Sequence, residues 1–230
     1  MVLRVAILLS LLFAVTAEAR KRYDFNDEDY LAPASAMSSW QALLDRYAEQ
    51  RDDLLNCVSP RGCKGRLKSF NRILRKARGL SERDQLHLVN FYINRNDYDE
   101  DRIRRERDEE GRRRVMRTEW VTLYEFLSKD GDCEDYATSK YFMLRELGYE
   151  PSRLRVVVAH VRRPRGYHAV LAVEQTDGSV WLLDSDNTIR KTSHGEYRFV
   201  YAVNEESIWD HRDDYIGAEK VGAEKLSKRS

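Results

Sequence analysis

The sequence lacks most of the patterns that identify common classes of binding protein. Its five histidines and three cysteines have no zinc-site spacing, and there is neither a phosphate-binding glycine loop nor a dinucleotide-binding fingerprint. Acidic and basic residues nearly cancel, leaving a formal net charge of +1, so composition gives no reason to expect nucleic acid or an anionic membrane as a partner. No internal repeat or low-complexity segment occurs, and 42% hydrophobic with 34% charged residues is typical of a globular protein.

Long apolar runs are also absent, except at the N-terminus. The run from Val5 to Val15 is shorter than the about 20 residues that a membrane-spanning helix needs. It follows Arg4 and precedes Ala17-Glu18-Ala19, which has the small-x-small form of a signal-peptidase site. We therefore expect residues 1–19 to be a cleaved signal peptide, with an uncleaved anchor as the alternative. The mature protein is then expected in the periplasm, with no integral membrane segment.

The rest of the chain is short enough for one domain. We expect a flexible or surface-lying lead-in at residues 20–37, a domain at 38–212 and a polar tail at 213–230. Residues 97–117 carry many acids and bases in alternation, which neutralise one another. A solvated helix or loop is therefore favoured there over a patch that binds nucleic acid.

Apolar spacing predicts helices in the first part of the domain and strands in the second. The fold class is therefore α+β, with a helix that begins at a cysteine packed on an antiparallel sheet. Ser38 or Ser39 is a candidate cap for the first helix, and the segment that starts at Ser81 resembles a capping box. Helices are predicted at Ser39–Leu55, Leu67–Arg78, Glu82–Ile93 and Cys133–Leu147, and strands at Leu154–Val161, Tyr167–Val173 and Val180–Leu183.

The three cysteines are an odd number for an exported protein. Cys57 and Cys63 lie close together in a turn-rich segment, so we expect them to form a disulfide in an oxidising compartment, with two reduced thiols as the alternative. Cys133 then remains as a single free thiol.

Cys133 lies at a predicted helix N-terminus, where backbone amides and the helix dipole favour an anion. We therefore expect the pKa of this thiol to be lowered. A thiol nucleophile also needs a base, and the base needs a polar group that orients it. His168 and Asp184, on successive predicted strands, can fill these two roles and complete a catalytic triad.

The loop between the last two predicted strands decides whether Asp184 shares the face of His168. A plain two-residue loop at Asp177-Gly178 would pair Asp184 with Leu171 and point it away from His168. A loop of odd length, with Gly178 in the left-handed position of a G1 bulge, places both side chains on one face, and we predict this odd loop. Asp186 has the same parity and is the alternative orienting acid, although it follows the strand by enough to lie in a loop.

Three segments resemble, in the same order, motifs of the bacterial transglutaminase-like cysteine peptidases. The segment from Gly131 to Ala137, continuing to Gly148, is similar to the nucleophile motif of that family. Tyr167 to Val173 resembles its histidine strand, and Trp181 to Asp184 resembles its aspartate strand. Weaker similarity extends the resemblance over residues 38–210.

The resemblance implies a papain/transglutaminase-like core and a requirement for calcium. The family's calcium ligands map most directly onto Asp132 and Glu134, with Asp135 as a further candidate, and carboxylate oxygens suit this ion. The alternative is that Asp132 caps the helix while Glu134 and Asp135 complement its dipole.

The resemblance also implies an exported protease that cleaves a cell-surface protein such as a large biofilm adhesin. An inner-membrane cyclic-di-GMP receptor is the regulator that it implies. The sequence departs from the family pattern because Trp120–Phe126 lacks a proline and Asp184 is followed by Ser185 instead of Asn. Two alternatives stay open on the same scaffold: acyl transfer to an amine, and a non-catalytic exported binding module.

Overall fold

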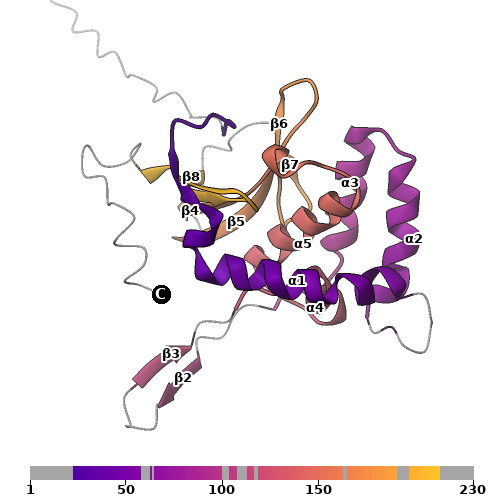
Figure 1. Cartoon of the computed structure of the whole chain (residues 1–230), viewed down its shortest axis with the longest axis horizontal. Helices are drawn as coiled ribbons and strands as arrows, with labels where there is room; N and C mark the ends of the chain where they lie inside the picture. The colour runs from indigo at the N-terminus through magenta and orange to yellow at the C-terminus, as the bar shows by residue number, and fades with distance from the viewer. Residues whose placement is uncertain are drawn as a thin grey trace, which may run out of the picture.

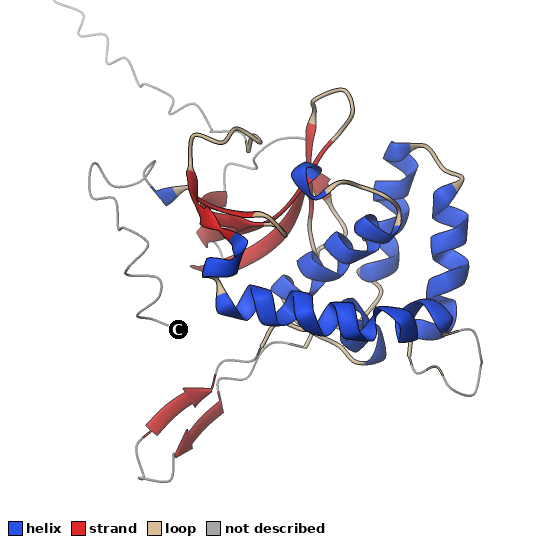
Figure 2. Cartoon of the chain, viewed as in Figure 1, coloured by secondary structure: helices blue, strands red, loops and turns tan. Residues whose placement is uncertain are grey.

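The computed structural model describes most of the chain between residues 23 and 212 (Figures 1 and 2). The expected signal peptide and the expected C-terminal tail lie outside the described residues. Among the residues that are described, no helix is long and apolar enough to cross a bilayer. The described residues are 23–57, 63, 65–99, 104–107, 113–116, 119–162, 165–190 and 197–212.

In the described part of the chain, five α-helices pack on one side of a sheet, as Figure 2 shows. The helix that begins at Cys133, α5, is central to this layer. It contacts β4 and β5 on one side and α3 and α4 on the other, and Figure 1 shows it between the sheet and α3. The helices are α1 (Ser38–Asn56), α2 (Leu67–Arg78), α3 (Glu82–Ile93), α4 (Leu123–Ser128) and α5 (Cys133–Glu146).

The main sheet is antiparallel and has the strand order β1-β9-β8-β4-β5-β6-β7. The three strands predicted from sequence form the expected meander β4-β5-β6, which confirms the α+β class. The other four strands were not predicted. The seven strands are β1 (Tyr30–Pro33), β4 (Leu154–Arg162), β5 (Arg165–Glu174), β6 (Val180–Leu183), β7 (Ile189–Arg190), β8 (Tyr197–Val203) and β9 (Ser207–Asp210).

The central strands are buried on both faces, and because side chains alternate along a strand, neighbouring residues belong to different hydrophobic clusters. Val156 of β4 and Leu171 of β5 belong to the large core beneath the helices. Their neighbours Val157 and Val170 belong to a second cluster on the opposite face. The sheet therefore needs a cover on the face that the helices leave free.

That cover includes part of the segment that was expected to be a flexible or surface-lying lead-in. Tyr23 is only 5% exposed within the second cluster, and β1 pairs with β9, so residues 23–37 are part of the fold. The guanidinium of Arg155 lies 3.6 Å from the ring centroid of Trp209 and donates a 3.0 Å hydrogen bond to the carbonyl of Phe25. These residues are therefore not flexible and belong to the domain, which the prediction began at residue 38. Their anchors are single side chains, which give no periodic signal.

Helix ends agree in part with the predicted signals. The Ser81 hydroxyl accepts a 3.3 Å hydrogen bond from the Asp84 N–H at the start of α3, and Gly148 has φ +95° after the end of α5. By contrast, α1 begins at Ser38 and has no side-chain cap, so the predicted cap by Ser38 or Ser39 was wrong.

Part of the charged segment at residues 97–117 forms a hairpin. Strands β2 (Arg104–Arg107) and β3 (Arg113–Met116) pair antiparallel, and Figure 2 shows them standing away from the main sheet and the helices. The prediction of a helix or loop was wrong for these strands. The segment consists mostly of charged residues, so it shows no apolar period that would distinguish a strand from a helix.

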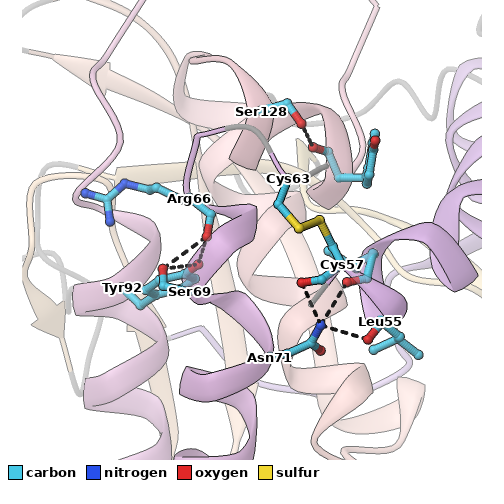
Figure 3. The surroundings of a disulfide bond; sticks show 10 residues. Leu55, Cys57, Cys63, Arg66, Ser69, Asn71, Tyr92 and Ser128 are labelled. Carbon is cyan, nitrogen blue, oxygen red and sulfur yellow. Dashed lines mark hydrogen bonds between the residues drawn. A yellow bond between two sulfur atoms is a disulfide. The ribbon is translucent and has the colours of Figure 1, made fainter. Parts of the chain in front are cut away.

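The disulfide between Cys57 and Cys63 is present and joins the end of α1 to the start of α2 (Figure 3). Beside it, the amide of Asn71 on α2 donates to the backbone carbonyls of Leu55 at 2.7 Å and of Cys57 at 3.4 Å. Asn71 thereby satisfies carbonyl groups that the end of a helix leaves without partners. Cys133 is the free cysteine.

Replacing both Cys57 and Cys63 with Ser is expected to lower the free energy of unfolding by about 2 kcal/mol. The bridge closes a short loop and so restricts the unfolded chain. Urea unfolding of the double variant and of wild type measures the difference, and reduced wild type serves as the control that should match the variant. An unchanged midpoint would show that the bridge does not stabilise the fold.

Candidate active site

The thiol of Cys133 is held at the first residue of α5. The carboxylate of Asp135, two residues later, holds the backbone that precedes Cys133. It accepts a 3.3 Å hydrogen bond from the Asp132 N–H and a 2.8 Å hydrogen bond from the Val121 N–H. A Cβ atom at Gly131 would collide with this carboxylate, so only glycine fits there. The backbone that precedes the nucleophile candidate is therefore fixed.

The environment of the thiol differs from the prediction. Sγ of Cys133 donates a 3.2 Å hydrogen bond to Oε2 of Glu134, and the backbone N–H of Ala169 lies beside the sulfur. Burial raises the pKa of the thiol, and the negative charges of Glu134 and Asp132 raise it further, while the Ala169 N–H acts in the opposite direction. The predicted lowering was wrong because the helix N-terminus is weaker than burial combined with two adjacent acids.

The hairpin between β5 and β6 has the predicted odd loop. Gln175 pairs with Ser179 through a 2.8 Å backbone hydrogen bond, which leaves Thr176, Asp177 and Gly178 in the loop. Gly178 has φ +77°, the left-handed conformation that a G1 bulge requires. The strand pairing in turn places Leu171 opposite Leu183.

As a consequence, the side chains of His168 and Asp184 meet. Nε2 of His168 lies 2.7 Å from Oδ1 of the buried Asp184 carboxylate. The thiol of Cys133, at the start of α5, lies beside the backbone N–H of Ala169, the residue that follows His168 on β5. The three residues that the sequence singled out thus come from the start of α5, from β5 and from the end of β6.

The carboxylate of Asp184 has further donors that the sequence did not reveal. Oδ2 forms a 2.8 Å ion pair with Arg190 and accepts a hydrogen bond from the Tyr197 hydroxyl. Oδ1 also accepts a hydrogen bond from the Ser185 N–H. Burial acts to raise the pKa of Asp184, but the bonds and charges of His168, Tyr197 and Arg190 outweigh it and lower that pKa. The carboxylate is therefore held as an anion.

Asp186, the alternative orienting acid, does not contact the imidazole. Its side chain is 49% exposed and forms a 3.0 Å ion pair with Arg190. It also accepts a 2.9 Å hydrogen bond from the Thr188 N–H, in the loop that follows β6. Of the two acids, Asp184 is the one whose position can orient His168.

A group of possible metal ligands surrounds the thiol. Among the described residues, one ligand atom each from Asp132, Cys133 and Glu134 lie within 4.8 Å of one another. Both oxygens of Asp135 accept backbone N–H groups instead, and Asp135 is outside this group. The carboxylate oxygens of Asp132 and Glu134 are of the kind that a hard cation such as calcium prefers, although calcium takes about six to eight oxygens and the Cys133 sulfur is not a ligand of that kind.

Tyr98 is another neighbour of the thiol that sequence reasoning missed. It forms an isolated backbone bridge with Gly131, and its ring centroid lies 5.8 Å from that of Tyr136. Burial raises the pKa of this phenol, and the adjacent Cys133 raises it further. Tyr98, Arg190 and Tyr197 lie outside any apolar period or known spacing, so no sequence signal marked them.

An α+β fold with a thiol at a helix start, and a histidine and an aspartate in contact on successive strands, is typical of transglutaminase-like cysteine hydrolases. Residues 62–214 match the bacterial transglutaminase-like cysteine proteinase family (BTLCP), and the chain belongs to that family. It is accordingly a cysteine peptidase, and its substrate is a protein. This confirms the resemblance and the fold class that the sequence indicated.

Solved structures of LapG from Legionella pneumophila are similar to this chain. The calcium-bound form is 26% identical, with a TM-score of 0.54, over 71% of this chain and 88% of that one. The EGTA-treated form is 22% identical, with the same TM-score of 0.54, over 87% of this chain and 98% of that one, and this level of identity supports the fold alone. A search of curated proteins found no match.

The variant Asp184→Asn is expected to be less stable than wild type near neutral pH. The folded pKa of Asp184 lies below its unfolded value of about 3.9, so the stability that its charge contributes is complete above that value and is lost as the pH falls through the folded pKa. The difference in unfolding free energy should thus shrink below about pH 4.

Urea unfolding of both proteins across this pH range measures the difference. Glu49→Gln, which changes an exposed acid of α1, is the control for the loss of a negative charge. A difference between Asp184→Asn and wild type that stays constant with pH would contradict the assignment of a stabilised anion.

Proposed function

We propose that this chain is an exported cysteine protease that hydrolyses peptide bonds with a triad of Cys133, His168 and Asp184. The observation that supports the proposal is the 2.7 Å contact between His168 and the buried Asp184. The Ala169 N–H, one residue further along β5, lies beside the Cys133 sulfur. A histidine held by a carboxylate beside a thiol at a helix start is the arrangement that nucleophilic acyl transfer needs.

Nε2 of His168 lies 2.7 Å from Oδ1 of Asp184, which leaves Nδ1 for the thiol. In this proposal, Nδ1 exchanges a proton with Cys133. Cys133 transfers its proton to His168, and the sulfur attacks the carbonyl carbon of the peptide. The imidazolium then protonates the leaving amine, and water, deprotonated by the same nitrogen, releases the acid from the thioester.

The tetrahedral intermediate carries a negative oxygen that needs a donor. The backbone N–H of Cys133 lies at the N-terminus of α5, where helical N–H groups have no partner within the helix. This N–H would serve as one donor of the oxyanion hole, and the dipole of α5 would add to its effect.

The protease is proposed to depend on calcium, with Asp132 and Glu134 as ligands. Bound by these residues, calcium would supply positive charge next to a thiol whose pKa the two adjacent acids raise. The proximity of the two carboxylates supports the site, as does the calcium-bound LapG structure. Glu134 also accepts the hydrogen bond of the Cys133 thiol, so any ligand of Glu134 competes with that contact.

We infer the biological setting from the resemblance of the nucleophile, histidine and aspartate motifs. The substrate is a cell-surface protein such as a biofilm adhesin, the compartment is the periplasm, and an inner-membrane cyclic-di-GMP receptor is the regulatory partner. The sequence departs from the family pattern at Trp120–Phe126, which lacks a proline, and at Ser185, which directly follows Asp184. The surface that admits the substrate is thus expected to differ from that of other family members.

Purified mature protein is expected to cleave an unfolded test protein or the N-terminal segment of a large adhesin. Cys133→Ala and His168→Ala should lower the rate by at least about a thousandfold, because each removes a member of one cooperative unit. Mass spectrometry of the products measures cleavage. His160→Ala, on the neighbouring strand β4, is the matched control and should retain the wild-type rate.

A labelled primary amine in the same reaction separates hydrolysis from acyl transfer. Incorporation of the label would contradict simple proteolysis and favour a transglutaminase. A folded wild-type protein that forms neither product and does not react with a thiol-directed probe would favour the non-catalytic binding module.

Calcium is expected to stabilise wild type against heat and not to stabilise the double variant Asp132→Asn with Glu134→Gln. At a free concentration one hundred times the dissociation constant, linkage predicts about 2.7 kcal/mol. Thermal unfolding with calcium and with EGTA measures the effect, and Glu150→Gln, an exposed acid beyond the end of α5, is the control. Equal unfolding temperatures of wild type under both conditions would remove the calcium site from the proposal.

A further inference from the structure

Lys140 is a buried charged residue that the proposed mechanism does not use. It is fully buried on α5, seven residues after Cys133, which is about two helical turns and places both on one face of the helix. A fully buried lysine is rare unless it has a partner, so its contacts indicate what it does.

The partner of Lys140 is the main chain of Asp184. Nζ of Lys140 donates a 2.9 Å hydrogen bond to the backbone carbonyl oxygen of Asp184. Nδ2 of Asn94, at the C-terminal end of α3, donates a 2.7 Å hydrogen bond to the same oxygen. On the other side, the Asp184 N–H donates to the carbonyl of Thr188 at 3.1 Å. Two helices and the loop after β6 therefore fix the peptide groups of Asp184.

Burying the charged amine of Lys140 in this position is unfavourable. Burial lowers the pKa of Lys140 to about 7, although the negative charges of Asp184 and Asp186 act to raise it. Nζ also lies 5.8 Å from the ring centroid of Tyr136 on the same helix. An apolar side chain of similar size would avoid the cost of burying the amine, so packing alone does not explain a lysine here.

We propose that Lys140, together with Asn94, is a positioning residue that holds the main chain of Asp184 so that its carboxylate meets His168. This inference rests on the proposed triad. The carbonyl oxygen and the carboxylate belong to one residue, so a rotation of the backbone that moves the first also moves the second. Errors of about 1 Å in the geometry of a catalytic site lower rates by about a hundredfold.

Lys140→Met and Lys140→Gln test this role. Met fills similar space without a donor, whereas the Gln amide retains an N–H that can reach toward the carbonyl. The second-order rate of alkylation of Cys133 by iodoacetamide, with calcium present in all samples, reports how well the imidazole activates the thiol. We expect Lys140→Met to lower this rate about tenfold or more. Lys140→Gln should recover part of the loss, and Lys68→Met, an exposed lysine of α2, should leave the rate unchanged.

Stability separates positioning from a structural role. The folded pKa of Lys140 lies below its unfolded value of about 10.4, so the cost of burying the charge is complete below about pH 7 and is relieved as the pH rises toward 10. Lys140→Met should thus unfold at no lower urea concentration than wild type at pH 6. A variant that loses stability and alkylation rate together at that pH would overturn the proposal.

Coupling to Asp184 provides the decisive comparison. In an Asp184→Asn background the orienting carboxylate is already absent, so adding Lys140→Met should change the alkylation rate less than about twofold. Effects that multiply would show that Lys140 acts independently of Asp184. If His168→Ala leaves the wild-type rate unchanged, the triad itself fails. If His168→Ala slows alkylation and Lys140→Met does not, only the positioning role fails.

Discussion

The buried carboxylate of Asp184 is the point at which the elements of the site converge. Its side chain accepts hydrogen bonds from His168 on β5 and Tyr197 on β8 and an ion pair from Arg190 on β7. Its main-chain carbonyl accepts from Lys140 on α5 and from Asn94 at the end of α3. Asp184, at the end of the short strand β6, is thereby held from several sides, and its contact with Nε2 fixes the orientation of the His168 imidazole.

The start of α5 sets a different constraint, because it combines a thiol with acids. Asp132 and Glu134 flank the sulfur, and their charges and the burial of the site raise the pKa of Cys133. The same carboxylates form the group of oxygens that suits a hard cation. These two acids therefore oppose a thiolate, and they are also the residues on which the proposed dependence on calcium rests.

The sheet can position these groups because it is packed on both faces. Helices cover one face, and Tyr23 and Phe25 of the N-terminal segment contribute to the cover on the other. Arg155 of β4 connects the sheet to this N-terminal segment, because its guanidinium lies over the ring of Trp209 on β9 and donates a hydrogen bond to the carbonyl of Phe25. Strands β4 and β5 are therefore enclosed, and an enclosed strand is a rigid support for His168.

The sequence by itself determined the helices other than α4, the β4-β5-β6 meander, the disulfide and the candidate residues Cys133, His168 and Asp184. Apolar period, turn residues and local spacing are local properties, and the short helix α4 was missed. The odd loop at Gly178 was also predictable, since loop length sets which face a strand presents. Only the tertiary structure decided the raised pKa of the thiol, the donors Arg190 and Tyr197 of the Asp184 carboxylate, the hydrogen bond from Lys140 to the Asp184 carbonyl, and the packing of the N-terminal segment. Each of these depends on residues far apart in the chain, whose burial and mutual distance exist only once the helices and the sheet have packed.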